Sequence, residues 1–310
     1  MLLFLAVAGC ASQPRPGSPH ELYNRLLNVR CLAFDPTGAL LVGGRNKASD
    51  GGGDLLIWDL LRQPSMRELP AHPDSLVSLG FGPQGLMTAG YEGSVLSWDT
   101  VSWTSQPLLQ LPRWLSCARF SAQEPVVAVL RASGKSTFQP QRAQLLLHNE
   151  KLQGSAVQFE VPGAIDVALS PDGGRLAALM SDGKVKFWSP QGTAGAQLEG
   201  QATCLAFSPD GKQLAVGNQQ GIVTLWDSLS AGSNTALPSL GQPIRALCFS
   251  PDGRRLAYSY EGHLLLSEQG KVVWDRPVDS YATPLVIAFS PDGRRLATAG
   301  ASKVLLWSDL

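Results

Sequence analysis

Few residues of this 310-residue chain are spaced in a way that could support catalysis or metal binding. The four histidines, His20, His72, His148 and His263, are widely separated and show no spacing typical of zinc ligands. A Ser-His-acid triad would need an activated nucleophile and oxyanion donors, and no part of the chain identifies either. We therefore expect a protein that is not an enzyme and that has no metal site and no cofactor.

Three other sets of residues resemble ligand sites but have a simpler interpretation. The run from Ala132 to Thr137 contains Gly-Lys-Ser-Thr, but Val129 stands where a phosphate-binding loop needs its first glycine, so we interpret the run as an insertion loop. A calcium site needs six or more converging oxygens. Four aspartates that could suggest calcium are each alone on a separate predicted hairpin, namely Asp172, Asp210, Asp252 and Asp292. Four cysteines are expected to be small buried hydrophobic residues, namely Cys31, Cys117, Cys204 and Cys248.

A repeated tetrapeptide indicates which elements position these residues. Ser-Pro-Asp-Gly occurs four times, starting at Ser170, Ser208, Ser250 and Ser290. Proline presets φ, aspartate can bond its own backbone and glycine adopts a positive φ, so each copy predicts the turn of a β-hairpin. Tryptophans recur with a period of about 40 residues, since Trp58 and Trp98 are 40 positions apart and Trp188 and Trp226 are 38 apart. A second marker is the phenylalanine near the end of the first strand of each unit, replaced by leucine in the fourth unit. It indicates seven units, at Phe34, Phe81, Phe120, Leu169, Phe207, Phe249 and Phe289.

The dipeptides that close these units carry a family resemblance. Trp58-Asp59, Trp98-Asp99 and Trp226-Asp227 resemble the closing dipeptide of WD-repeat β-propellers, and Trp188-Ser189 and Trp307-Ser308 are degraded copies. His148-Asn149 and Ser267-Glu268 occupy the same place without the motif. The resemblance covers residues 21–310 and implies an all-β fold, a seven-bladed β-propeller of four-stranded antiparallel blades. The last unit lacks a fourth strand, and we expect Glu21–Leu27 to supply it and close the ring.

The same resemblance implies a structural role for one group of polar residues. His72, Thr88, Glu92 and Trp98 match the family's hydrogen-bonded tetrad, with Glu92 in place of the usual aspartate. Such a buried chain would tie a loop to two strands. Arg119 occupies a position that is small in the other six units, so its charge must be paired or must reach water in the central channel.

Partner binding is expected on the face that carries the longest loops. By resemblance, the enlarged loops Arg45–Gly53 and Arg131–Arg142 lie on the same face as the loops that lead into each blade. Arginine and aromatic residues dominate the energetics of protein interfaces. The candidates are Arg30, Arg45, Lys47, Tyr91, Arg113, Trp114, Arg131, Lys135, Arg142, Arg245, Tyr260 and Tyr281.

The N-terminal segment bears on where in the cell the protein is located. The apolar run Leu2–Ala8 followed by Gly9-Cys10 resembles a bacterial lipoprotein signal. This resemblance implies a signal peptide at residues 1–9, lipidation of Cys10, a tether at residues 10–20 and anchorage in a bacterial cell envelope. A cytoplasmic protein without lipid is the alternative.

Charge and composition narrow the class of function. The chain has 25 Lys and Arg and 25 Asp and Glu, so no overall positive field would recruit nucleic acid. We expect a monomeric, non-catalytic scaffold that binds other proteins through its loop-rich face. The alternatives are a propeller enzyme or small-ligand binder that uses the mouth of the central channel, and a cytoplasmic scaffold.

Overall fold

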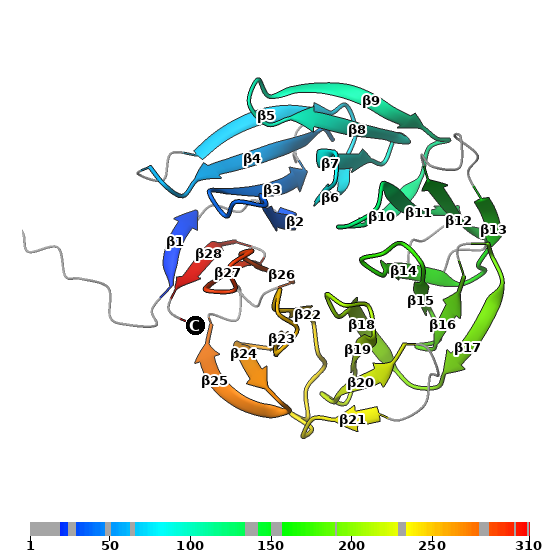
Figure 1. Ribbon diagram of the computed structural model, residues 1–310, viewed down its shortest axis with the longest axis vertical. Helices are drawn as coiled ribbons and strands as arrows, with labels where there is room; N and C mark the ends of the chain where they lie inside the picture. Colours follow the sequence, from blue (N-terminus) through cyan, green and yellow to red (C-terminus); the bar gives the residue numbers. More distant parts are fainter. Residues whose placement is uncertain are drawn as a thin grey trace, which may run out of the picture.

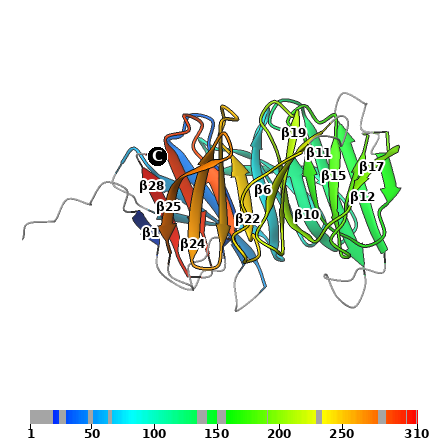
Figure 2. The same ribbon diagram turned by 90° about the horizontal axis from the view of Figure 1, so that it is seen from below.

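The protein is an all-β ring, seen here in a computed structural model (Figure 1). The structure describes residues 19–23, 29–46, 51–62, 66–133, 142–149, 157–189, 191–228, 234–278, 285–300, 302–308 and 310. These residues form 28 strands arranged in seven four-stranded antiparallel sheets, which are the blades of a β-propeller. The seven innermost strands surround the centre, and the side view shows the blades standing next to one another around the axis (Figure 2).

The first four blades follow the chain from the inner to the outer strand. Blade 1 contains β2 (Val29–Phe34), β3 (Leu40–Asn46), β4 (Gly53–Asp59) and β5 (Met66–His72). Blade 2 contains β6 (Leu76–Gly82), β7 (Gly85–Gly90), β8 (Ser94–Asp99) and β9 (Thr104–Gln110). Blade 3 contains β10 (Leu115–Phe120), β11 (Val126–Ser133), β12 (Arg142–Asn149) and β13 (Val157–Glu160). Blade 4 contains β14 (Ala164–Leu169), β15 (Leu176–Met180), β16 (Val185–Trp188) and β17 (Ala194–Leu198).

The remaining blades follow the same order, except that the last is completed from the other end of the chain. Blade 5 contains β18 (Ala202–Phe207), β19 (Gln213–Asn218), β20 (Val223–Asp227) and β21 (Asn234–Ala236). Blade 6 contains β22 (Ala246–Phe249), β23 (Arg255–Tyr260), β24 (His263–Glu268) and β25 (Lys271–Pro277). Blade 7 contains β26 (Val286–Phe289), β27 (Arg295–Ala299), β28 (Val304–Ser308) and the N-terminal strand β1 (His20–Tyr23).

The pairing of β1 with β28 closes the ring, as the sequence predicts. The register places His20 opposite Leu306 and Tyr23 opposite Val304, and Lys303 forms an ion pair with Glu21 at 3.3 Å. Leu22 packs against the cluster between blades 7 and 1. The pairing begins at His20, so this residue belongs to blade 7 and the tether boundary at residue 20 is wrong by one residue. Residues 24–27 of the expected closing segment lie outside the described residues.

The Ser-Pro-Asp-Gly turns join the first and second strands of blades 4 to 7, and all four share one set of hydrogen bonds. In blade 5, the Ser208 hydroxyl donates to Asp210 Oδ1 at 2.6 Å and accepts from the Gln213 amide at 2.9 Å. Gly211 adopts a φ of +70°, a conformation that glycine tolerates without steric cost. The hydrogen bond from Ser208 is the main reason that the pKa of Asp210 lies below its usual range. The four aspartates are therefore turn residues held by their own hairpins.

The hydrophobic core is divided into seven clusters, and each lies between two neighbouring blades. Between blades 7 and 1, for example, Trp58 and Leu41 pack against Ala297 and Leu306. This arrangement explains why the inner strands are apolar on both faces, because each sheet is covered on both sides by its neighbours. No single blade can bury its own apolar surface, so the ring folds as one unit.

A second contact between blades comes from the arginine that ends the Ser-Pro-Asp-Gly turn. Arg255 of blade 6 donates to the Gly293 carbonyl of blade 7 at 2.5 Å, and Arg295 of blade 7 donates to the Gly38 carbonyl of blade 1 at 2.6 Å. Each guanidinium also lies about 6 Å from the marker phenylalanine ring of the next blade. In blade 4, Arg175 reaches blade 5 through the Ser228 hydroxyl, which in turn donates to the Gly211 carbonyl. Gln213 occupies this position in blade 5.

Two loops are shorter than predicted from the sequence. Arg45 lies within β3 and Gly53 begins β4, so the enlarged loop of blade 1 is confined to the residues between Asn46 and Gly53. Arg131 lies within β11 and Arg142 begins β12, because the register of these two strands continues to the pair Ser133 and Arg142. Cross-strand pairing therefore extends further into both segments than their polar composition indicates. None of the described segments forms a helix with the length and apolarity that a membrane span requires.

Candidate functional site

Antiparallel pairing fixes which loops share a face of the ring. Each inner strand begins on one face, the second strand returns to it, and the third strand leaves from it. We call this the top face, and the opposite one, which carries the Ser-Pro-Asp-Gly turns, the bottom face. The top face therefore carries the loops between blades and the loops between second and third strands.

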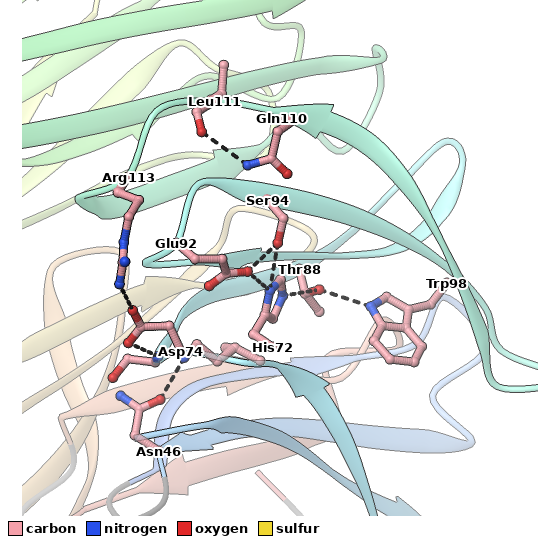
Figure 3. Close-up of polar contacts among 12 residues, drawn as sticks. Asn46, His72, Asp74, Thr88, Glu92, Ser94, Trp98, Gln110, Leu111 and Arg113 are labelled. Carbon is pink, nitrogen blue, oxygen red and sulfur yellow. Dashed lines mark hydrogen bonds and ion pairs between the residues drawn. The ribbon is translucent and has the colours of Figure 1, made fainter. Parts of the chain in front are cut away.

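A buried polar network lies below the top face in blade 2 (Figure 3). His72, at the end of β5, has its Nε2 2.8 Å from the Thr88 hydroxyl of β7, and Trp98 of β8 donates its indole N–H to the same hydroxyl at 2.9 Å. His72 Nδ1 lies 2.6 Å from Glu92 Oε1. Since the carboxylate accepts and the indole donates, the Thr88 hydroxyl donates to Nε2 and Nδ1 carries the proton. The structure thus brings together all four residues of the expected tetrad.

Ser94 is a fifth member that the sequence analysis did not identify. Its hydroxyl donates to Glu92 Oε1 and lies 3.0 Å from His72 Nδ1. Burial opposes ionisation of Glu92, but the hydrogen bonds from His72 and Ser94 outweigh it and hold the pKa of the carboxyl below its ordinary value. A Cβ atom at Gly90 would collide with His72 Nδ1 and the Glu92 carboxylate, so the network also requires glycine there. The hydrogen bonds use His72, Thr88, Ser94, Trp98 and Glu92 Oε1, whereas Glu92 Oε2 is buried without a partner among the described residues. Mutual hydrogen bonding among these side chains favours a structural role.

In blades 1, 4 and 5, which keep the tryptophan, the threonine position is occupied by Gly43, Ala178 and Val216, so the network cannot form there. By register, Gly43 of blade 1 takes the place of Thr88, and Trp58 Nε1 is buried without a hydrogen-bond partner among the described residues. In blade 7 the equivalent residue is Thr298, and Trp307 donates to its hydroxyl at 3.1 Å. Blade 7 thus retains the hydrogen bond between the tryptophan and the threonine.

Four of the candidate binding residues meet on the top face at the junction of blades 2 and 3. We call Tyr91, Arg113, Trp114 and Arg131 the blade 2–3 cluster. Trp114 adopts a φ of +80°, which is rare for a residue other than glycine, and its N–H donates to the Tyr91 carbonyl at 2.8 Å. Its side chain is 46% exposed, and the Arg131 guanidinium lies 5.9 Å from its ring centroid.

Arginine contacts hold this cluster in place. Arg131 donates to the Arg113 carbonyl at 2.9 Å and to Gln144 Oε1 at 3.1 Å. Arg113, whose side chain is 67% exposed, forms an ion pair with Asp74 at 2.8 Å, next to the polar network of blade 2 (Figure 3). The cluster therefore presents an aromatic ring and two guanidinium groups on a supported loop.

The central channel contains a cavity of about 400 Å³ lined by the inner strands. Two further candidates, Arg30 and Arg245, line it, and so does Arg119. Arg119 donates to Asp166 Oδ1 at 2.8 Å, and the Cys117 thiol donates to the same oxygen at 3.1 Å. Burial is the largest influence and opposes the charged form of Arg119, but the interactions with Asp166, Cys117 and Cys31 together outweigh burial and raise the pKa of the guanidinium. Arg119 therefore lies in the channel and is paired, as its unusual position in the repeat suggests.

The cysteines lie on the inner strands and no disulfide joins the four that the structure describes. Burial raises the pKa of Cys31, Cys117 and Cys204 to about 12 and that of Cys248 to about 11. All four are therefore neutral thiols near pH 7.

Of the remaining candidates, the structure describes the side chains of Arg45 and Tyr260, and their ion pairs and ring stacking lie outside the blade 2–3 cluster and the channel. Arg45 is held by Asp54 and Glu68 on the strands of blade 1. Tyr260 stacks on His263, with ring centroids 4.8 Å apart. Cys10, Lys47, Lys135 and Tyr281 lie outside the described residues, as does the side chain of Arg142. No group of His, Cys, Asp and Glu side chains within the described ranges could hold a metal ion.

Comparison with known protein families gives matches over two parts of the chain. The WD domain, G-beta repeat, matches residues 158–189, a segment that runs from β13 to the end of β16. The VID27 C-terminal WD40-like domain matches residues 199–276, which cover blade 5 and all of blade 6 except its last residue, Pro277. A search of curated proteins found no match. Together with the seven-bladed ring, the two family matches support a WD-repeat β-propeller.

Proposed function

We propose that this protein is a non-catalytic scaffold that binds a partner protein through the blade 2–3 cluster on its top face. The observation that carries the proposal is Trp114, an aromatic residue that is 46% exposed, has a positive φ and has the Arg131 guanidinium 5.9 Å from its ring centroid. A WD40 propeller is consistent with a protein-binding scaffold. A strained residue persists only where the surrounding structure determines it, and such residues gather at functional sites.

The chemistry of the blade 2–3 cluster suits protein recognition. Tryptophan and arginine are the residue types most enriched among those that dominate binding energy, and they act best at the centre of a desolvated contact. The ion pair with Asp74 and the hydrogen bond from Arg131 hold both arginines in place before a partner arrives. Less conformational entropy is then lost on binding.

Trp114→Gly separates binding from stability. Glycine adopts a positive φ without strain, so this variant should be as stable as the wild type or more stable by up to about 1 kcal/mol. If the cluster is the docking site, the same variant should lose roughly tenfold or more of its partner affinity. Wild type and variant are immobilised, partners from an extract of the source cells are quantified by mass spectrometry, and stability is measured by urea unfolding.

Trp103→Gly is the matched control. Trp103 also has a positive φ, 58°, but lies in the turn between β8 and β9 on the bottom face, where it packs against the cluster between blades 1 and 2. This control should lose stability and keep its partners. Equal recovery of every protein by wild type and Trp114→Gly would refute the docking site, and so would equal losses with both variants.

We also propose that the scaffold is anchored by lipid at Cys10 in a bacterial envelope. The support is the apolar run Leu2–Ala8 directly before Gly9-Cys10, followed by a Pro- and Ser-rich stretch suited to a tether. Cells that express the full chain should incorporate labelled palmitate into the protein, and Cys10→Ala should abolish the label. An unlabelled wild-type protein in the soluble fraction would instead favour the cytoplasmic scaffold.

A further inference from the structure

The mouth of the central channel combines cationic and apolar side chains on consecutive blades. Arg245 precedes β22 of blade 6, Leu285 precedes β26 of blade 7, and Arg30 lies in β2 of blade 1. All three line the cavity of about 400 Å³. Leu285 is 56% exposed, and both arginines are exposed as well.

The two arginines at the mouth differ from the arginine deeper in the channel. Arg119 is compensated by Asp166. The guanidinium groups of Arg30 and Arg245 form no ion pair or hydrogen bond with any residue that the structure describes. Among the described residues of the channel, they are the charges that a ligand could neutralise.

The charged residues lining the cavity give it a net positive charge. Arg30, Arg119 and Arg245 contribute three positive charges and Asp166 one negative charge, which leaves +2 among the described lining residues. The lining cysteines add none, because burial keeps Cys31 and Cys204 as neutral thiols. A cleft with low-dielectric walls concentrates such a potential and attracts anions into it.

We infer that Arg30, Arg245 and Leu285 form a binding site for a carboxylate that carries a short apolar group. Guanidinium groups bind carboxylates through paired, charge-assisted hydrogen bonds, and Leu285 offers an apolar contact that a bare inorganic anion cannot use. The cavity has the size of a small-ligand site. Such a carboxylate is supplied either by a free organic acid or by a Glu or Asp side chain of another protein. The site is separate from the blade 2–3 cluster.

Calorimetric titration of the full-length protein at low salt tests this inference with three probes. The probes are glutarate, the capped peptide acetyl-Leu-Glu-Glu-Leu-amide and inorganic phosphate. At least one carboxylate probe should bind more tightly than phosphate, and its affinity should fall as NaCl is added, because the contacts are ionic. Replacing both glutamates of the peptide by glutamine should abolish its binding.

Substitution at the mouth locates the site. The double variant Arg30→Gln, Arg245→Gln should bind the carboxylate probe at least roughly tenfold more weakly, since each arginine loses a charged hydrogen bond. The matched control Arg254→Gln, Arg294→Gln removes the same charge from exposed arginines beside the turns of the bottom face and should bind normally. Trp114→Gly should also bind normally, which distinguishes failure of this site from failure of the docking site.

Each possible result of these titrations either supports the inference or overturns it. Binding of glutarate identifies a free organic acid as a sufficient ligand, and binding of the peptide alone identifies an acidic segment of another protein; both support the inference. Tighter binding of phosphate, unchanged binding by the folded channel double variant, an equal loss in the control, or no binding by any probe overturns it. Circular dichroism and the melting temperature establish that each variant is folded.

Discussion

A chain that lacks β1 (His20–Tyr23) is expected to lose roughly 3–5 kcal/mol of unfolding free energy, because it loses a row of backbone hydrogen bonds to β28 and the burial of Leu22. The ion pair between Glu21 and Lys303 is partly exposed and adds little to this loss. Without its partner, β28 becomes a bare sheet edge, so the shortened protein should also aggregate more readily.

Urea unfolding and light scattering measure both effects. The reference is a chain that starts at Pro19, which keeps all four residues of β1. If the chain that starts at Asn24 unfolds at the same urea concentration as the reference, then the pairing of β1 with β28 does not stabilise the ring.

The second large effect is expected at the centre of the polar network in blade 2. Thr88→Val keeps the shape of the side chain but removes the hydroxyl that bonds both His72 Nε2 and Trp98 Nε1. Thr88 is fully buried, so neither partner can turn to water. Leaving two buried polar groups unsatisfied should cost roughly 2–4 kcal/mol.

Thr298→Val in blade 7 is the matched control. Thr298 is also buried, but among the residues that the structure describes its hydroxyl bonds only to Trp307, and the expected loss is about 1 kcal/mol. Both losses are read from urea unfolding curves. Equal losses at the two positions would mean that His72 contributes nothing through Thr88, and the network would then be a set of independent contacts.

Periodicity predicts the fold of this chain well because one local signal is repeated. The Ser-Pro-Asp-Gly turn fixes the hairpin between the first two strands of blades 4 to 7, and the tryptophan marks the end of the third strand in blades 1, 2, 4, 5 and 7. The missing fourth strand of the last unit then requires a donor, and the segment that starts near Glu21 is suited to this role. The tetrad could be located only through the family resemblance, because His72 and Thr88 are 16 residues apart and lie in different blades.

Contacts between blades are much harder to predict from the sequence. Arg175, Arg255 and Arg295 recur five residues after the turn serine, which is a visible signal, but their partners are backbone carbonyls and a hydroxyl of the next blade. Backbone carbonyls carry no signature in the sequence. Likewise, the positive φ of Trp114 and the stacking of Arg131 on its ring depend on how blades 2 and 3 meet. The sequence predicts that both residues are candidates but not that they touch.

The pairing of β1 with β28 in blade 7 also determines when the ring can close during synthesis. During translation β1 emerges first of all strands and β28 last, and Tyr23 and Val304 are 281 positions apart. At typical rates of synthesis, ribosomes need roughly 15 s to 1 min to add that many residues. Until β28 is synthesised, β1 lacks the strand with which it pairs in the folded ring. Ring closure therefore has to wait for β28, and nascent chains interrupted before Val304 would present an unpaired β1 to chaperones and proteases.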